Sequence, residues 1–248
     1  MAHLTLDQLV AQLAQVHGER LRCVLLYGSS AVRDGARSGG GDANTRGDRN
    51  VLVLVDRIDA HQLEALGATT RAWVEAGNPP PFELTVDEWE RSADIFPMEY
   101  ADILAQHRVL HGALPEARPV HRHDLRRQAE YEATSKVLRL RQAIMHAGTD
   151  GARHREVLRA SHGTLLAILR AAIRVADEPV PGERAAMIER VAQLAGLEAA
   201  SFLRVHDDRQ GARPISEREA ESVLLETLAQ MERLAHWLDR EDTGAGPA

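Results

Sequence analysis

Two short apolar segments constrain the fold of this chain more than any other feature. The first, residues 23–27 (Cys-Val-Leu-Leu-Tyr), ends in Gly28-Ser29-Ser30. The second, residues 51–55 (Val-Leu-Val-Leu-Val), directly follows Asp48-Arg49-Asn50. Continuous apolar, β-branched runs of this length are typical of strands that are buried on both faces. We therefore predict two buried strands, one ending in a Gly-Ser turn and one beginning at an acidic turn.

The sequence around these strands predicts an α/β domain, a mixed sheet with flanking helices. Apolar residues at helical spacing cover 4–17, where Thr5 is a capping candidate, and 59–76. Residues 82–85 are predicted to form an edge strand, 86–92 a short helix and 98–103 a further strand. These elements give a domain that spans residues 1–115.

The predicted secondary structure changes from mixed α/β to helical at the proline-rich segment 115–119. From Leu125 onward the apolar spacing is helical, and Ser216 with Glu219 forms a capping box before a long last helix. We expect an all-α helical bundle over 120–241 and a disordered tail over 242–248. Residues 121–174 carry eleven basic and five acidic side chains, so these helices present either a surface for an anionic ligand or a solvated face.

Composition excludes several classes of protein. The formal net charge is −7, which gives no global basic bias of the kind seen in dedicated nucleic-acid binders. Cys23 is the only cysteine, so an internal disulfide and a cysteine-based zinc site are excluded. The sequence shows neither a signal peptide nor an apolar stretch of about 20 residues. We expect a soluble, cytoplasmic protein without a membrane segment.

A Gly-Ser turn and an acidic turn at the ends of neighbouring strands suit phosphate chemistry. Small residues let backbone N–H groups and a serine hydroxyl approach phosphates closely. Carboxylates on alternate residues of a strand point the same way and can share Mg²⁺, which prefers oxygen ligands and bridges to substrate phosphates. A third carboxylate from a neighbouring strand would complete the metal site or activate a hydroxyl.

The segment from Leu25 to Ala31, followed by 47–54 (Gly-Asp-Arg-Asn-Val-Leu-Val-Leu), resembles the signature of the nucleotidyltransferase superfamily. Aminoglycoside and minimal nucleotidyltransferases carry this signature as hydrophobic-Gly-Ser, a loop, and Asp-x-Asp before an apolar strand. Residues 94–112 look like an uncharacterised bacterial subgroup whose members have a helical C-terminal domain. The motif covers about 30 residues, and a weaker resemblance extends over the first 115.

The resemblance implies a role for each matching residue. Gly28, Ser29 and Ser30 would bind the phosphates of a nucleoside triphosphate, and Asp48 would be the principal Mg²⁺ ligand. The second acidic position of the signature is Asn50, an amide that ligates a cation without adding negative charge. This departure is expected to weaken the metal site. The candidates for the third carboxylate, as base or metal ligand, are Glu83, Glu99 and Asp102, with Glu99 favoured slightly.

Two functions follow from this resemblance. The first is an enzyme that uses Mg²⁺ to transfer a nucleoside monophosphate from a nucleoside triphosphate to a hydroxyl of an acceptor. The acceptor, whether small molecule, protein or RNA, is not encoded in any motif, and a homodimer stays open. The alternative is a catalytically impaired member of the fold that binds a nucleotide or a partner. In that case the basic helices of 121–174 would serve the partner.

Overall fold

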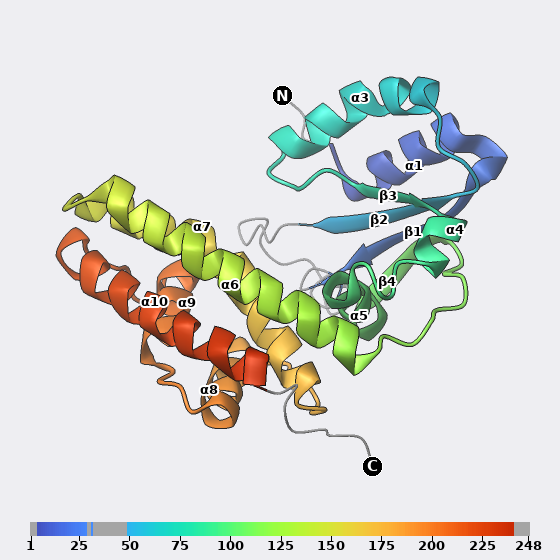
Figure 1. Cartoon of the computed structure of the whole chain (residues 1–248). Helices are drawn as coiled ribbons and strands as arrows, with labels where there is room; N and C mark the ends of the chain where they lie inside the picture. The colour runs from blue at the N-terminus through green and yellow to red at the C-terminus, as the bar shows by residue number, and fades with distance from the viewer. Residues whose placement is uncertain (1–3, 29–30, 32–48, 241–248) are drawn as a thin grey trace, which may run out of the picture. The chain divides into compact units, whose positions relative to one another are not determined.

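The computed structural model describes residues 4–28, 31 and 49–240 and has a mixed α/β fold (Figure 1). The chain divides between His121 and Arg122 into two compact units. The described part of the first unit contains a four-stranded sheet with helices, and that of the second contains helices only. No helix of the described ranges is both long and apolar enough to cross a membrane.

The sheet of the first unit is mixed and has the strand order β3-β2-β1-β4. Strand β1 runs antiparallel to both of its neighbours, whereas β2 and β3 are parallel and are joined by a helical crossover. The two buried strands and the edge strand predicted from the sequence are confirmed. The strands are β1 (Leu21–Tyr27), β2 (Asn50–Val55), β3 (Phe82–Thr85) and β4 (His107–Gly112).

Helices cover both faces of this sheet (Figure 1). One face packs against α1 (Leu6–His17) and α3 (Ala60–Glu75), in a core that includes Leu9, Val53 and Trp73. The other face packs against α4 (Val86–Glu90) and α5 (Pro97–Ala105), in a core that includes Leu52 and Trp89. Because both faces are buried, residues 23–27 of β1 and 51–55 of β2 are apolar at every position rather than at alternate ones.

Local side-chain caps explain where the helices of the first unit begin. The Thr5 side chain accepts a hydrogen bond from the Gln8 backbone N–H, and the Gln8 side-chain oxygen accepts one from the Thr5 backbone N–H, which confirms the predicted cap of α1. Asp59 caps α3 by accepting from the backbone N–H of Gln62. Thr85 caps α4 in the same way. A single turn of 3₁₀ helix, η1 (Gly18–Arg20), then leads from α1 into β1.

The strand predicted over residues 98–103 is wrong, because this segment forms helix α5. Pro97 occupies the first helical turn, where its missing N–H costs no hydrogen bond. Tyr100 and Ile103, three residues apart, are both buried and Tyr100 stacks on Trp89 with ring centroids 4.1 Å apart. A spacing of three places both side chains on one face of a helix, whereas a strand would turn them to opposite faces.

The described part of the second unit consists of five helices, of which α6, α7 and α10 pack against one another along their lengths (Figure 1). Helix α10 begins after the predicted cap, since the Glu219 backbone N–H donates to Ser216 Oγ over 3.3 Å. The bounds are α6 (Arg122–Ala147), α7 (Gly151–Val175), α8 (Arg184–Ala195), α9 (Ala200–Gln210) and α10 (Glu217–Arg240).

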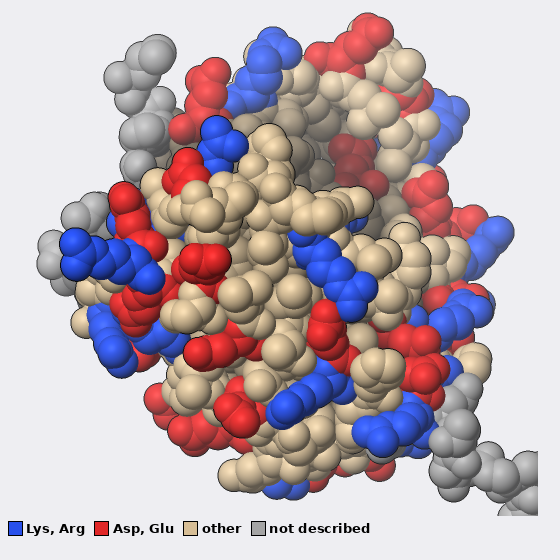
Figure 2. Space-filling model, turned by 60° about the vertical axis from the view of Figure 1, so that its left-hand side comes forward, with Lys and Arg blue, Asp and Glu red and all other residues tan. Residues whose placement is uncertain are grey.

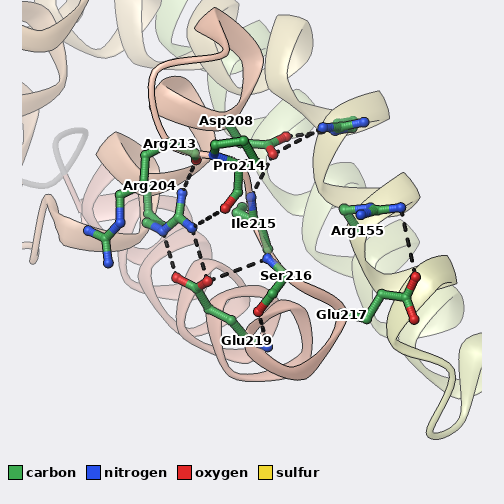
Figure 3. Close-up of polar contacts among 10 residues, drawn as sticks. Arg155, Arg204, Asp208, Arg213, Pro214, Ile215, Ser216, Glu217 and Glu219 are labelled. Atoms are coloured by element: carbon green, nitrogen blue, oxygen red, sulfur yellow. Dashed lines mark hydrogen bonds and ion pairs between the residues drawn. The ribbon is translucent and has the colours of Figure 1, made fainter.

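One buried arginine, Arg204 on α9, holds the turn between α9 and α10 (Figure 3). Its guanidinium donates to both carboxylate oxygens of Glu219, over 2.7 and 3.0 Å, and to the backbone carbonyls of Arg213 and Pro214. Asp208 completes the turn by accepting from the Ile215 backbone N–H over 2.8 Å. A fork of five fixed donors suits this set of acceptors, which a lysine could not satisfy.

Acidic partners offset part of the positive charge of residues 121–174. Three of these partners come from outside that stretch: Asp208 binds Arg159, Glu217 lies 3.9 Å from Arg155, and Glu232 binds Arg141. On the face in Figure 2, basic and acidic side chains of the described residues are interspersed rather than gathered by sign. This distribution favours a solvated helical surface over a site for an anionic ligand.

We predict that Arg204→Met lowers the free energy of unfolding by about 3 kcal/mol, because Glu219 and two carbonyls then lose their shared donor. The matched control is Arg155→Met, which removes an exposed ion pair 3.9 Å long and should cost less than about 1 kcal/mol. Urea unfolding of the full chain, followed by circular dichroism, measures both. Equal losses for the two variants would contradict the role given to Arg204.

Candidate functional site

The candidate site lies where β1 ends and β2 begins. Tyr27, the last residue of β1, lies opposite Asn50, the first residue of β2. Because side chains alternate along a strand, Tyr27 and Asn50 share the face that carries Leu25 and Leu52. That face packs against α4 and α5. The sheet therefore presents the Asn50 amide and the Tyr27 ring side by side at one end, towards the helix α5.

Gly28 makes a tight turn directly after Tyr27. Its φ is +73°, which L-residues rarely adopt, and its carbonyl accepts the Ala31 backbone N–H over 3.1 Å. Its own N–H donates to the Gln106 carbonyl over 3.2 Å, which ties the turn to the end of α5. A Cβ placed on Gly28 would lie 3.4 Å from Asn50 Nδ2. The structure thus brings Gly28 and Asn50, two of the residues predicted from sequence, into contact.

Three predicted residues, Ser29, Ser30 and Asp48, lie outside the described residues. The chain next to Asp48 is described, however: the Arg49 backbone N–H donates to Asn78 Oδ1 over 3.3 Å. Asn78 also donates from Nδ2 to the Trp73 carbonyl over 3.3 Å, so it links the end of α3 to the start of β2. This role of Asn78 was not predicted from the sequence. In the sequence, only the position of Asn78 directly after Gly77 indicated it, and Gly77 has a φ of +88° in the structure.

Two carboxylates of α5 contribute to a raised pKa of the Tyr27 hydroxyl. Burial, and to a smaller extent the negative charges of Glu99 and Asp102, raise the pKa of the Tyr27 hydroxyl to about 12. An electrostatic effect of this kind requires both carboxylates to lie near the hydroxyl. Glu99 is exposed and Asp102 is partly buried. Of the three candidates for the third carboxylate, Glu99 and Asp102 belong to α5, the helix that packs on the face of the sheet that carries Asn50.

The third candidate, Glu83, lies in a different environment. It pairs with Val53 on β2, and Val53 faces the α1 and α3 side of the sheet. Its Oε1 lies 3.4 Å from Nε2 of His17, whose side chain has no exposed surface. Burial raises the pKa of Glu83 and lowers that of His17, and neither of these two atoms makes a hydrogen bond. The structure does not bring Glu83 together with Asn50.

Strand β3 also offers no other carboxylate level with Asn50. The register pairs Phe82 with Leu52, so two residues earlier the segment that precedes β3 carries Pro80. A carboxylate from the neighbouring strand was the arrangement expected from sequence. Among the described residues, the candidate carboxylates on the Asn50 face of the sheet belong to helix α5 instead.

Magnesium prefers oxygen ligands, and the described donors at this end of the sheet are oxygens: the Asn50 amide and the Glu99 and Asp102 carboxylates. These oxygen donors are of the type that magnesium prefers, but there are too few of them to hold the ion. Within the described ranges, no three or more His, Cys, Asp or Glu side chains are grouped so as to hold a metal ion. Asp48, the principal ligand implied by the resemblance, is not among these residues.

The sequence matches no model of a known protein family, and it matches no curated protein. The geometry at the end of β1 and β2 therefore carries the functional argument. The residues that define it are Gly28, Tyr27, Asn50 and the two α5 carboxylates.

We predict that Gly28→Ala lowers the free energy of unfolding by roughly 1–2 kcal/mol, because alanine is strained at φ +73°. The matched control in the same unit is Gly67→Ala, in the interior of α3, which should stabilise by about 0.5–1 kcal/mol. Urea unfolding of the full chain measures both changes. A Gly28→Ala variant as stable as the unmodified chain would show that the turn adopts another conformation.

Proposed function

We propose that the first unit has a nucleotidyltransferase-type fold, binds a nucleoside triphosphate at the end of β1 and β2, and transfers its nucleoside monophosphate to an acceptor hydroxyl. The observation that carries the proposal is that Asn50 lies opposite Tyr27 and beside the Gly28 turn, on the face of the sheet that α5 covers with its carboxylates Glu99 and Asp102. The antiparallel pairing of the Gly-Ser strand with the strand after Asp48 supports it. The second unit, as a helical bundle, would select the acceptor.

The Gly28 turn suits the phosphates. A glycine at positive φ leaves no side chain between the backbone and a ligand, so phosphate oxygens can approach the backbone closely at this turn. The hydroxyls of Ser29 and Ser30 would add donors to the same phosphates. Asn50 lies against this turn and would orient the phosphates through its amide without repelling them.

In the reaction, the acceptor oxygen forms a bond to the α-phosphorus, and the bond from that phosphorus to the bridging oxygen breaks. Pyrophosphate leaves with the bonding electron pair, and the acceptor proton passes to a carboxylate. We assign the carboxylate to Glu99 or Asp102, because Glu83 faces the opposite side of the sheet. Magnesium, held by Asp48 with Asn50 as a weaker neutral ligand, would neutralise negative charge on the phosphates.

A second function is supported by the same residues. Asn50 replaces a carboxylate, and Pro80 stands where the neighbouring strand would supply another. Both features reduce the negative charge available for a metal ion, which favours a module that binds a nucleotide or a partner without turnover. The two functions differ in whether bound triphosphate is consumed.

Isothermal titration calorimetry with ATP and GTP, with and without magnesium, tests both. We expect magnesium-dependent binding of a nucleotide to the unmodified chain and a loss of at least about tenfold in affinity for Asp48→Ala, because the principal metal ligand is removed. Glu83→Gln is the matched control, and its affinity should not change, since Glu83 packs against His17. Absence of binding under all four conditions would exclude the enzyme and the nucleotide-binding module alike.

We further expect Asn50→Asp to raise magnesium affinity, because it restores a negative charge beside Asp48. The measurement is a magnesium titration of the nucleotide complex, compared with the unmodified chain. An unchanged affinity would show that residue 50 does not face the metal. Pyrophosphate release assayed in parallel separates the enzyme from the non-catalytic module.

A further inference from the structure

A pocket of about 510 Å³ in the second unit lies between the end of α8 and the last turns of α10. Helix α10 lines it with three exposed side chains, Arg233, His236 and Arg240, and α8 lines it with Ala195 and Gly196. Its volume is within the range of sites for small molecules. Among the described residues that line this pocket none is acidic, so its charge is positive.

The basic side chains of the pocket share one face of α10. Arg233 and His236 are three residues apart and His236 and Arg240 are four apart, the spacings that make side chains neighbours on a helix. Glu232, four residues before His236, instead accepts hydrogen bonds from Arg141 of α6, the shorter over 2.7 Å. The carboxylate of Glu232 is thus engaged by α6, while the basic residues line the pocket.

The two walls of the pocket are joined by a hydrogen bond. The Glu198 backbone N–H, just after α8, donates to Oε1 of the buried Gln230 over 3.0 Å. Gln230 precedes Arg233 by three residues, so the end of α8 is held beside the face that lines the pocket. Gly196 ends α8 at φ +66°, and a Cβ there would meet no atom of the described chain within 4 Å. The turn after α8 therefore leaves open space beside α10.

Local features of the helices do not account for the positive charge at Arg233. The residues three and four positions from it carry no carboxylate: Ala229, Gln230, His236 and Trp237. The dipole of α10 favours cations only in its last turn, and Arg233 lies almost two turns before Arg240. The carbonyls at the end of α8 amount to roughly half a negative charge, which offsets only part of the charge of two arginines.

We propose that this pocket binds the phosphate groups of a polyanion, whether they belong to a free polyphosphate or to a nucleic-acid strand. Each guanidinium presents a planar set of donors that matches the oxygens of a phosphate group. Arg233 and Arg240 are seven residues apart, about 10 Å along the helix axis, so they can bind two such groups with His236 between them. Binding here does not require nucleotidyl transfer by the first unit.

The first test uses a fluorescein-labelled oligothymidylate of about 12 nucleotides and the full chain. Magnesium is left out, because nucleotide binding by the first unit is expected to require it. Fluorescence anisotropy at several salt concentrations gives the affinity and its salt dependence. Arg233→Gln should weaken binding at least about fivefold and lower the slope of log K against log salt by about 0.7, the share of one phosphate contact.

Arg218→Gln is the matched control, because Arg218 is an exposed arginine in the first turn of α10 and its loss changes the net charge equally. Its affinity should change by less than about twofold. Calorimetry with tripolyphosphate applies the same two variants to a free polyphosphate and so distinguishes the two sources of phosphate. Circular dichroism of each variant checks that the fold is retained.

A larger loss for Arg233→Gln than for Arg218→Gln with either ligand would support the site and identify the ligand that it takes. Equal losses for the two variants with both ligands would overturn it, since binding would then follow net charge alone. A chain that binds neither oligothymidylate nor tripolyphosphate at low salt would overturn it as well.

Discussion

The antiparallel register of β1 is the constraint on which the rest of the candidate site depends. Tyr27 lies opposite Asn50 on one side and His107 on the other, so one residue of β1 fixes the level of both neighbouring strands. The Gly28 turn follows at once and is tied to Gln106. A shift of one residue in the pairing of β1 with β2 would turn Asn50 to the face opposite Tyr27, because side chains alternate along a strand.

The electrostatic environment at the Asn50 end of the sheet differs from that around Glu83. At the Asn50 end the strands contribute an amide and a phenol, and the negative charge comes from α5. Towards the middle of β3, Glu83 is buried against His17, where low polarity favours the neutral form of both groups. Burial thus disfavours the charged form of Glu83 that metal binding requires, whereas Glu99 is exposed and Asp102 is partly exposed.

The central strands could be predicted from sequence because an apolar run buried on both faces has few alternatives. The segment after Phe96 could not, since its apolar residues fit a strand or a helix, and the choice depends on the stacking of Tyr100 on Trp89. The placement of Glu83 depends in the same way on His17, a residue distant in sequence. The two buried strands and the edge strand could therefore be predicted from the sequence, whereas the origin of the carboxylates depends on non-local packing.

The pairing of β1 with β4 also bears on how this chain folds during synthesis. Strand β1 leaves the ribosome well before β4, but β4 is one of its two neighbours in the sheet. The Gly28 turn is likewise completed by Gln106, just before that strand. Until residues 106–112 emerge, one edge of a strongly apolar strand lacks its partner and offers its backbone to other chains. The growing chain therefore exposes this edge of β1 until residues 106–112 have been made.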